Sequence, residues 1–138
     1  SVGAYYKIIG DMERIGDQAA DIAELTIMMA DSPYLLNVEH IKKMSAETVM
    51  MLMQAVQAYV ERDMKKAQEV IEHDDIVDEL FVKVKTDLIE VMRNNADYAE
   101  HAADLLMVNK YLERIGDHAT NIAEWVIFSI DDHVNEKA

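Results

Sequence analysis

The chain of 138 residues contains no cysteine, one proline and four glycines. Without cysteine, disulfide bonds and thiolate metal sites are excluded. An all-β protein needs many turns, so the scarcity of proline and glycine favours a helical fold. No apolar run reaches the roughly 18 residues of a membrane-spanning helix, and the first residues lack the basic and then apolar pattern of a signal peptide. We therefore expect no direct insertion into a membrane.

Basic residues are also scarce relative to acidic ones. There are 13 Lys and Arg residues against 27 Asp and Glu residues, which gives a formal net charge of −14. Such a charge repels the phosphate backbone of nucleic acids and anionic lipids, and it favours cations and basic protein surfaces. Because 51% of the residues are hydrophobic, the chain is long and apolar enough to form one globular domain.

The hydrophobic periodicity predicts four helices, over about residues 5–30, 35–61, 64–93 and 98–130. Residues 31–33, which end in the one proline, are expected to stop the first helix. Asp63 and Asp97 are expected to cap the third and fourth helices. Because long helices joined by short connections lie antiparallel, the predicted fold is all-α, a long antiparallel up-down helical bundle.

The sequence Glu-Arg-Ile-Gly-Asp occurs at residues 13–17 and again at residues 113–117. This repeat aligns the first helix with the last one. It predicts that residues 1–31 are the last helix of an incomplete first bundle, that residues 34–131 form a complete three-helix bundle, and that residues 132–138 are a polar tail. The alternative is that the first helix completes a simple four-helix bundle.

The repeated motif places Glu and Asp four residues apart, so two carboxylates lie side by side on a helix face. Their repulsion costs about 0.2–0.5 kcal/mol, which a bound cation would offset. The helical wheel places this acidic face away from the apolar stripe. Its members are Glu113, Asp117, Glu124 and Asn109 on the last helix and Glu13, Asp17 and Glu24 on the first. The glycine within each motif is expected to let a neighbouring helix or ligand approach closely.

A second acidic pair, Asp74 and Asp78, lies beside the apolar stripe of the third helix. A neighbouring helix could bring these two carboxylates next to Glu113 and Asp117. Four carboxylates without His or Cys form a hard, oxygen-rich site that suits Mg²⁺, Ca²⁺, Mn²⁺ or iron better than a structural zinc ion, although zinc stays among the alternatives. The competing interpretation is an ordinary solvated face that binds nothing.

Other kinds of site have weak support in the sequence. No Glu is followed by His three residues later, so a ferritin-like di-iron enzyme is disfavoured. A phosphotransfer bundle would need one reactive histidine, and no pattern singles one out; His118 is expected to be a surface residue or an inter-helix contact. No phosphate-binding loop or nucleophile motif is present. The sequence thus favours a binding or regulatory module over an enzyme.

These residues resemble the PhoU family. In that family the last helix of each of two tandem three-helix bundles carries Glu-Arg-Ile-Gly-Asp and then an Asn-Ile-x-Glu-like stretch, which begins here at Asn121, whereas the first copy has Asp21 at the matching position. The resemblance implies a cytoplasmic, non-enzymatic regulator, associated with the inner membrane face only through its partners. Such a regulator would connect a phosphate ABC transporter to a sensor histidine kinase. The implied metal ligands are Asp74, Asp78, Glu113 and Asp117.

One departure from the family pattern concerns the first repeat. In the family two helices precede this point, and the resemblance implies that this sequence lacks them, so Glu13 and Asp17 are expected to have no acidic partner helix within the chain. The apolar stripe of the first helix is likewise expected to have no bundle in which to be buried. We therefore expect this helix to pair with another copy of the chain, in a homodimer or a swapped assembly.

Overall fold

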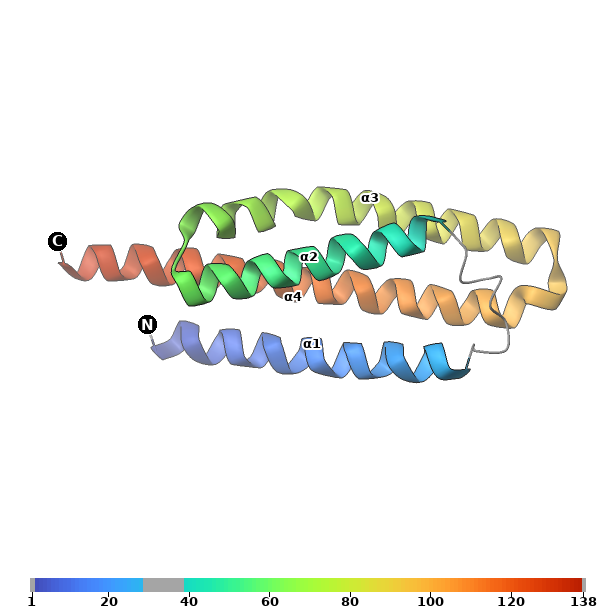
Figure 1. The fold of residues 1–138 in the computed structure, drawn as a ribbon, viewed down its shortest axis with the longest axis horizontal. Coiled ribbons are helices and arrows are strands. Elements are labelled where there is room, and N and C mark those ends of the chain that lie inside the picture. Colours follow the sequence, from blue (N-terminus) through green and yellow to red (C-terminus); the bar gives the residue numbers. More distant parts are fainter. Residues whose placement is uncertain (1, 29–38, 138) are drawn as a thin grey trace.

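Four long helices run along one axis of the molecule (Figure 1). The computed structural model describes residues 2–28 and 39–137. Over these residues the chain forms only helices, which confirms the all-α prediction. The elements are α1 (Val2–Met28), α2 (Glu39–Glu61), α3 (Met64–Asn94), the short 3₁₀ helix η2 (Ala96–Tyr98) and α4 (Ala99–Lys137).

The helices α2, α3 and α4 form a three-helix bundle in which each packs against the other two. Consecutive helices run in opposite directions (Figure 1), as the short connections predict. The helix α1 packs against α4, on the outside of this bundle. The arrangement is therefore a complete three-helix bundle with one added helix, and α1 does not close a symmetrical four-helix bundle.

The helix α1 buries one side of its apolar stripe within the chain. Ala4, Ile8 and Ile15 are buried, and they belong to the helix that packs against α4. Asp11 is also buried, and its Oδ1 lies 2.8 Å from Nδ1 of His118 on α4. The expectation that α1 has no partner in the chain is therefore wrong for this face, because α4 offers a second apolar side. The inter-helix role expected for His118 is confirmed.

The turn between α2 and α3 follows a known capping pattern. Arg62 adopts a left-handed backbone conformation with φ of 53°, and the amide of Asp63 donates to the carbonyl of Ala58 at 3.0 Å, which is the bond of a Schellman motif. The Asp63 side chain then accepts a hydrogen bond from the amide of Lys66 at 3.1 Å. The predicted N-cap of α3 is thus confirmed.

Two predicted helix ends differ from the structure. Asn95, rather than Asp97, is the capping residue at the α3–α4 corner, since its side chain accepts a hydrogen bond from the Asp97 amide. The extended backbone of Asn95 makes this Asx-type bond available. At the other end, α4 continues to Lys137 instead of giving way to a polar tail after residue 131. The predicted break at residues 31–33 and the predicted start of the second helix lie outside the described residues.

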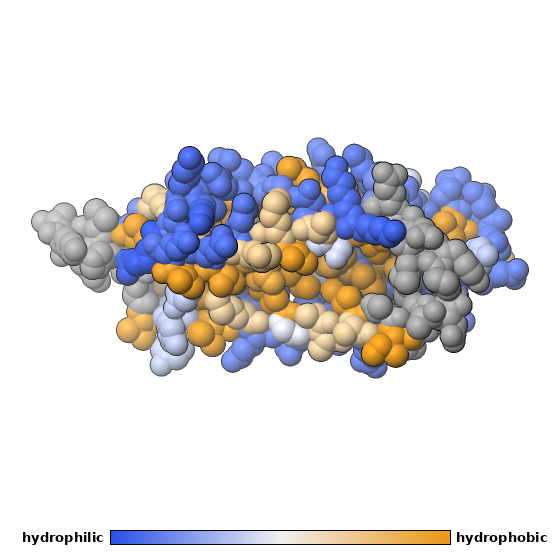
Figure 2. Space-filling view, viewed as in Figure 1, coloured by the Kyte–Doolittle hydropathy of each residue, from blue (hydrophilic) through white to orange (hydrophobic). Residues whose placement is uncertain are grey.

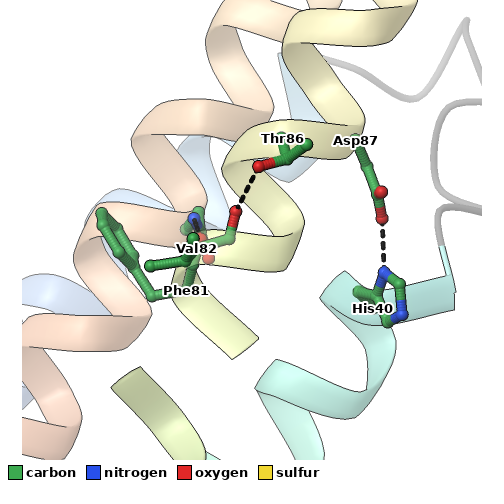
Figure 3. A network of polar contacts seen from close by, with 6 residues as sticks. His40, Phe81, Val82, Thr86 and Asp87 are labelled. Carbon is green, nitrogen blue, oxygen red and sulfur yellow. Dashed lines mark hydrogen bonds and ion pairs between the residues drawn. The ribbon is translucent and has the colours of Figure 1, made fainter. Parts of the chain in front are cut away.

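Two histidine–carboxylate pairs join α2 to α3. His40 points at Asp87, with Nδ1 and Oδ2 2.5 Å apart (Figure 3). His73 on α3 makes the second pair with Glu47 on α2. Because both pairs cross from one helix to the other, they help to fix how α2 lies on α3.

Candidate metal centre

The seam between α3 and α4 is fixed by a buried asparagine. Asn109 is 1% exposed, and its Nδ2 donates to the backbone carbonyl of Phe81 at 3.0 Å. Because the two helices are antiparallel, one turn forward on α4 leads to Glu113 while one turn back on α3 leads to Asp78. The hydrogen bond between Asn109 and Phe81 therefore places Glu113 and Asp78 one turn further along the same contact between α3 and α4.

A further turn adds Asp117 on α4 and Asp74 on α3, and the four carboxylates influence one another. Partial burial, followed by the charges of Asp78 and Asp117, raises the pKa of Asp74 from 3.8 to about 6. Its Oδ1 atom is buried and has no hydrogen-bond partner among the described residues. A buried carboxylate oxygen without a partner is unfavourable, so this position needs a proton or a cation.

Two other carboxylates of this cluster also have raised pKa values. Asp78 and Asp117 are both exposed residues. The partial loss of solvent around their carboxylates and then the charge of Glu113 raise the pKa of both above the usual value. Lys110 and His118 act in the opposite direction and lower the pKa of Asp117. Lys110 also lies against the cluster directly, with Nζ 2.7 Å from Oε1 of Glu113.

This donor set fits a hard cation in its chemistry. It consists of carboxylate oxygens only, it carries excess negative charge, and it contains the unpartnered oxygen of Asp74. The side chains are not drawn together around one point, however: within residues 2–28 and 39–137 no group of three or more His, Cys, Asp or Glu side chains is close enough to hold a metal ion. The packing of α3 on α4 therefore brings the carboxylates into the same region. Binding of a metal ion would require their side chains to turn toward a common point.

The candidates on the first repeat have no such surroundings. Glu13, Asp17 and Glu24 are all exposed on α1, the helix that packs along α4 on the outside of the bundle. Among the described residues, these three side chains are not part of any group of His, Cys, Asp or Glu that could hold a metal ion. The repeated motif thus occurs in two different settings, and only the second copy lies in an acidic seam.

The additional candidates on α4 also separate into two groups. Asn121 and Glu124 are exposed, beyond the turn that carries Asp117. Asn109 is buried at the opposite end of the seam, where its Nδ2 atom is used by Phe81 and its Oδ1 atom has no partner among the described residues. Asn109 therefore serves the packing of α3 on α4.

The two glycines of the repeat differ in the same way. A side chain at Gly116 would meet Val77 at 3.5 Å and Met51 at 4.0 Å, so this glycine lies where α2 and α3 approach α4. A side chain at Gly16 would meet nothing within 4 Å. The predicted close approach is thus found at the second copy of the motif and not at the first.

Two residues near the site were not identified in the sequence. Lys110 precedes Glu113 by three residues, a spacing that places both on one side of the helix and could have indicated the ion pair. Asp11 lies four residues before Ile15, within the apolar stripe of α1, and an acidic residue in such a stripe indicates a buried pair. Its partner His118 could not be identified without knowing how α1 packs on α4.

Known proteins resemble this chain over most of its length. The PhoU domain family matches residues 41–126. A "phosphate-specific transport system accessory protein PhoU homolog" from Clostridium acetobutylicum is 37% identical over 124 residues, which are 90% of this chain and 57% of that protein. A homolog of the same description from Borreliella burgdorferi is 32% identical, over 96% of this chain and 62% of its own length.

A solved structure gives the same result for the fold. The crystal structure of PhoU from Pseudomonas aeruginosa superposes with a TM-score of 0.85 and 27% identity, and the match covers 94% of this chain and 62% of that one. The chain therefore spans about three fifths of the length of the proteins that it matches.

Proposed function

Because this chain belongs to the PhoU family, we propose that it is a non-enzymatic accessory protein of phosphate-specific transport. The relatives that match most of its length carry this description in their names. In this role it regulates phosphate uptake and keeps the phosphate-starvation response off when phosphate is plentiful. Its partners are a phosphate ABC transporter and a sensor histidine kinase, and it works in the cytoplasm on the inner side of the membrane.

The charge of the chain supports this assignment. The net charge of −14 favours association with basic surfaces of partner proteins. Within the described residues, no helix combines the length and the apolar character that crossing a bilayer requires. We propose that contact with the membrane occurs through the transporter and the kinase.

The second element of the proposal is a metal ion on the α3–α4 seam. The observation that carries it is the buried, unpartnered oxygen of Asp74 inside a group of four carboxylates. Asp74, Asp78, Glu113 and Asp117 would hold the ion, and Mn²⁺, Mg²⁺, iron and Zn²⁺ are the candidates. A bound cation would neutralise the repulsion between the carboxylates and tie α3 to α4.

Metal content tests this proposal directly. We expect protein purified without chelator or metal-affinity resin to contain stoichiometric metal by plasma mass spectrometry, and we expect the Glu113→Gln/Asp117→Asn variant to lose it. The matched control is Glu13→Gln/Asp17→Asn, which makes the same change at the first copy of the motif and should keep the metal. At a metal concentration 100 times Kd, binding should raise the free energy of unfolding of the wild type by about 2.7 kcal/mol.

The opposite result would identify the acidic seam as a solvated surface. In that case none of the three proteins would contain metal, and adding Mn²⁺, Mg²⁺, Zn²⁺ or iron would not change their melting temperatures. Loss of metal in the control variant as well would move the site away from the α3–α4 seam.

We also propose that the chain forms a homodimer through α1. Positions of α4 that are buried in the bundle have exposed counterparts 100 residues earlier. The exposed residues Tyr5, Gly16, Ala19 and Ala23 correspond to the buried residues Leu105, Gly116, Ala119 and Ala123. An apolar band runs along this side of the molecule, where α1 and α2 lie next to each other (Figures 1 and 2). Covering it with a second copy would remove apolar surface from water.

Light scattering coupled to size exclusion measures this. We expect a mass of twice the 15.7 kDa of one chain, and we expect Ala19→Glu/Ala23→Glu to shift the protein toward the monomer because charges would enter the interface. Gln57→Glu, on the exposed side of α2, is the control and should stay dimeric. A wild type that is monomeric at all concentrations would contradict the dimer.

A further inference from the structure

The side chain of Lys110 makes two contacts beside the acidic seam. Its Nζ atom lies 2.7 Å from Oε1 of Glu113, and it lies 5.4 Å from the centre of the Phe81 ring. Phe81 belongs to α3, next to the helix that carries Lys110 (Figure 3). The ammonium group therefore bridges the two helices that contribute carboxylates to the candidate metal centre.

The ammonium group of Lys110 is paired with one of the carboxylate oxygens that a metal ion would use as a ligand. An ion pair at 2.7 Å takes up Oε1 of Glu113, and the positive charge of Lys110 also acts on Asp117. A divalent cation that approaches these residues meets a like charge. The Lys110 side chain is 45% exposed, so it can leave Glu113 without opening the core.

We propose that Lys110 is a built-in competitor for the metal, an ammonium group that occupies Glu113 until a divalent cation displaces it. This inference rests on the proposed metal site and adds to it the residue that sets its affinity. In the metal-free protein Lys110 partly neutralises the cluster. Metal binding then replaces the positive charge of Lys110 with that of the bound cation. The affinity for metal is therefore lower, and filling the site requires a higher metal concentration.

Phe81 gives the displaced ammonium group another partner. A Lys ammonium near an aromatic ring is attracted by the electrons of the ring face. Lys110 is already within this range, so it can release Glu113 and keep its contact with Phe81. Once Glu113 is released, the ammonium group is expected to move closer to the ring face, and this stronger contact lowers the cost of displacement. Removal of the ring should therefore weaken metal binding only while Lys110 is present.

Titration calorimetry with Mn²⁺ at fixed ionic strength tests the role of Lys110. We expect Lys110→Gln to bind Mn²⁺ about threefold to tenfold more tightly than the wild type, because one repelling charge is gone. Lys110→Arg keeps the charge and should bind within about twofold of the wild type. Lys65→Gln removes the same charge from an exposed position at the far end of α3 and is the matched control, with no more than about a twofold change expected.

Two further measurements separate competition from a structural role. In EDTA, Lys110→Gln should melt about 1–3 °C below the wild type because the carboxylates have lost their counter-ion, while with saturating Mn²⁺ it should melt at or above the wild type. Phe81→Leu should weaken Mn²⁺ binding about twofold to threefold in the wild type and leave it unchanged in Lys110→Gln.

Equal Mn²⁺ affinity of the wild type and Lys110→Gln would overturn the competitor role while leaving the metal site in place. Tighter binding by Lys65→Gln to the same degree would also overturn it, since the effect would then come from net charge. If no variant bound Mn²⁺, the proposed metal site itself would fail, and the role of Lys110 with it.

Discussion

Ile122→Ala is expected to lower the free energy of unfolding by about 2–4 kcal/mol, whereas Ile22→Ala at the equivalent position of the first repeat should lower it by no more than about 1 kcal/mol. Ile122 is 0% exposed and lies in the three-helix bundle, so its truncation leaves a cavity. Ile22 is only partly buried, on the helix that packs on α4, and water can fill the space. Urea unfolding with linear extrapolation measures both values.

The comparison is informative because the two positions share their sequence context. Both follow Glu-Arg-Ile-Gly-Asp by the same number of residues, so helix propensity and local spacing are matched. Any difference in cost must come from what packs against each helix. Equal losses in dilute protein would show that α1 is covered as completely as α4, which would contradict the exposed face described above.

Much of the fold could be predicted from the periodicity of apolar residues. The four helices, their antiparallel order and the Asp63 cap depend on local spacing and capping chemistry, which the sequence displays directly. The corner at Asn95 was assigned to the wrong residue because Asn and Asp both favour caps, and the backbone geometry decides between them. The extension of α4 to Lys137 was missed because polar residues near a terminus resemble a tail as much as an exposed helix.

The acidic seam was predictable only in part. Spacings of four residues place Asp74 with Asp78 and Glu113 with Asp117 on their own helices, and the crowding of all four now follows from how α3 packs on α4. The residues of the motif do not determine whether a neighbouring helix packs against it. Gly16 and Gly116 have the same sequence context, yet only Gly116 faces packed side chains, because the partner helices are supplied by residues elsewhere in the chain.

The crowding of the seam also predicts how stability depends on pH. We expect Asp74→Asn to raise the free energy of unfolding of the metal-free protein by about 1–2 kcal/mol at pH 7.5, a value reduced for the partial exposure of the group. Burial and neighbouring carboxylates raise the pKa of Asp74 to about 6, so its charged form is disfavoured in the folded state. Chemical denaturation in EDTA at a series of pH values measures the difference between the two proteins.

The sign follows from proton binding. Since the pKa of Asp74 is higher in the folded state than its ordinary value of 3.8, the folded protein binds the proton more tightly. The stability this provides is fully present below about pH 4 and is lost as the pH rises through about 6. The advantage of Asp74→Asn should therefore shrink between pH 7 and pH 4 and nearly disappear at the lower end. A constant advantage over this range would show that the charge of Asp74 is not its cause.

Bound metal should reverse the order of stability of the wild type and Asp74→Asn. A divalent cation needs the ionised carboxylate, so saturating Mn²⁺ at pH 7.5 should stabilise the wild type and leave Asp74→Asn with little gain. The same buried oxygen that destabilises the metal-free seam would then be a ligand. If Asp74→Asn stayed more stable than the wild type in saturating Mn²⁺, Asp74 would be a strained carboxylate without a metal-binding role, and the repulsion in the seam would need another explanation.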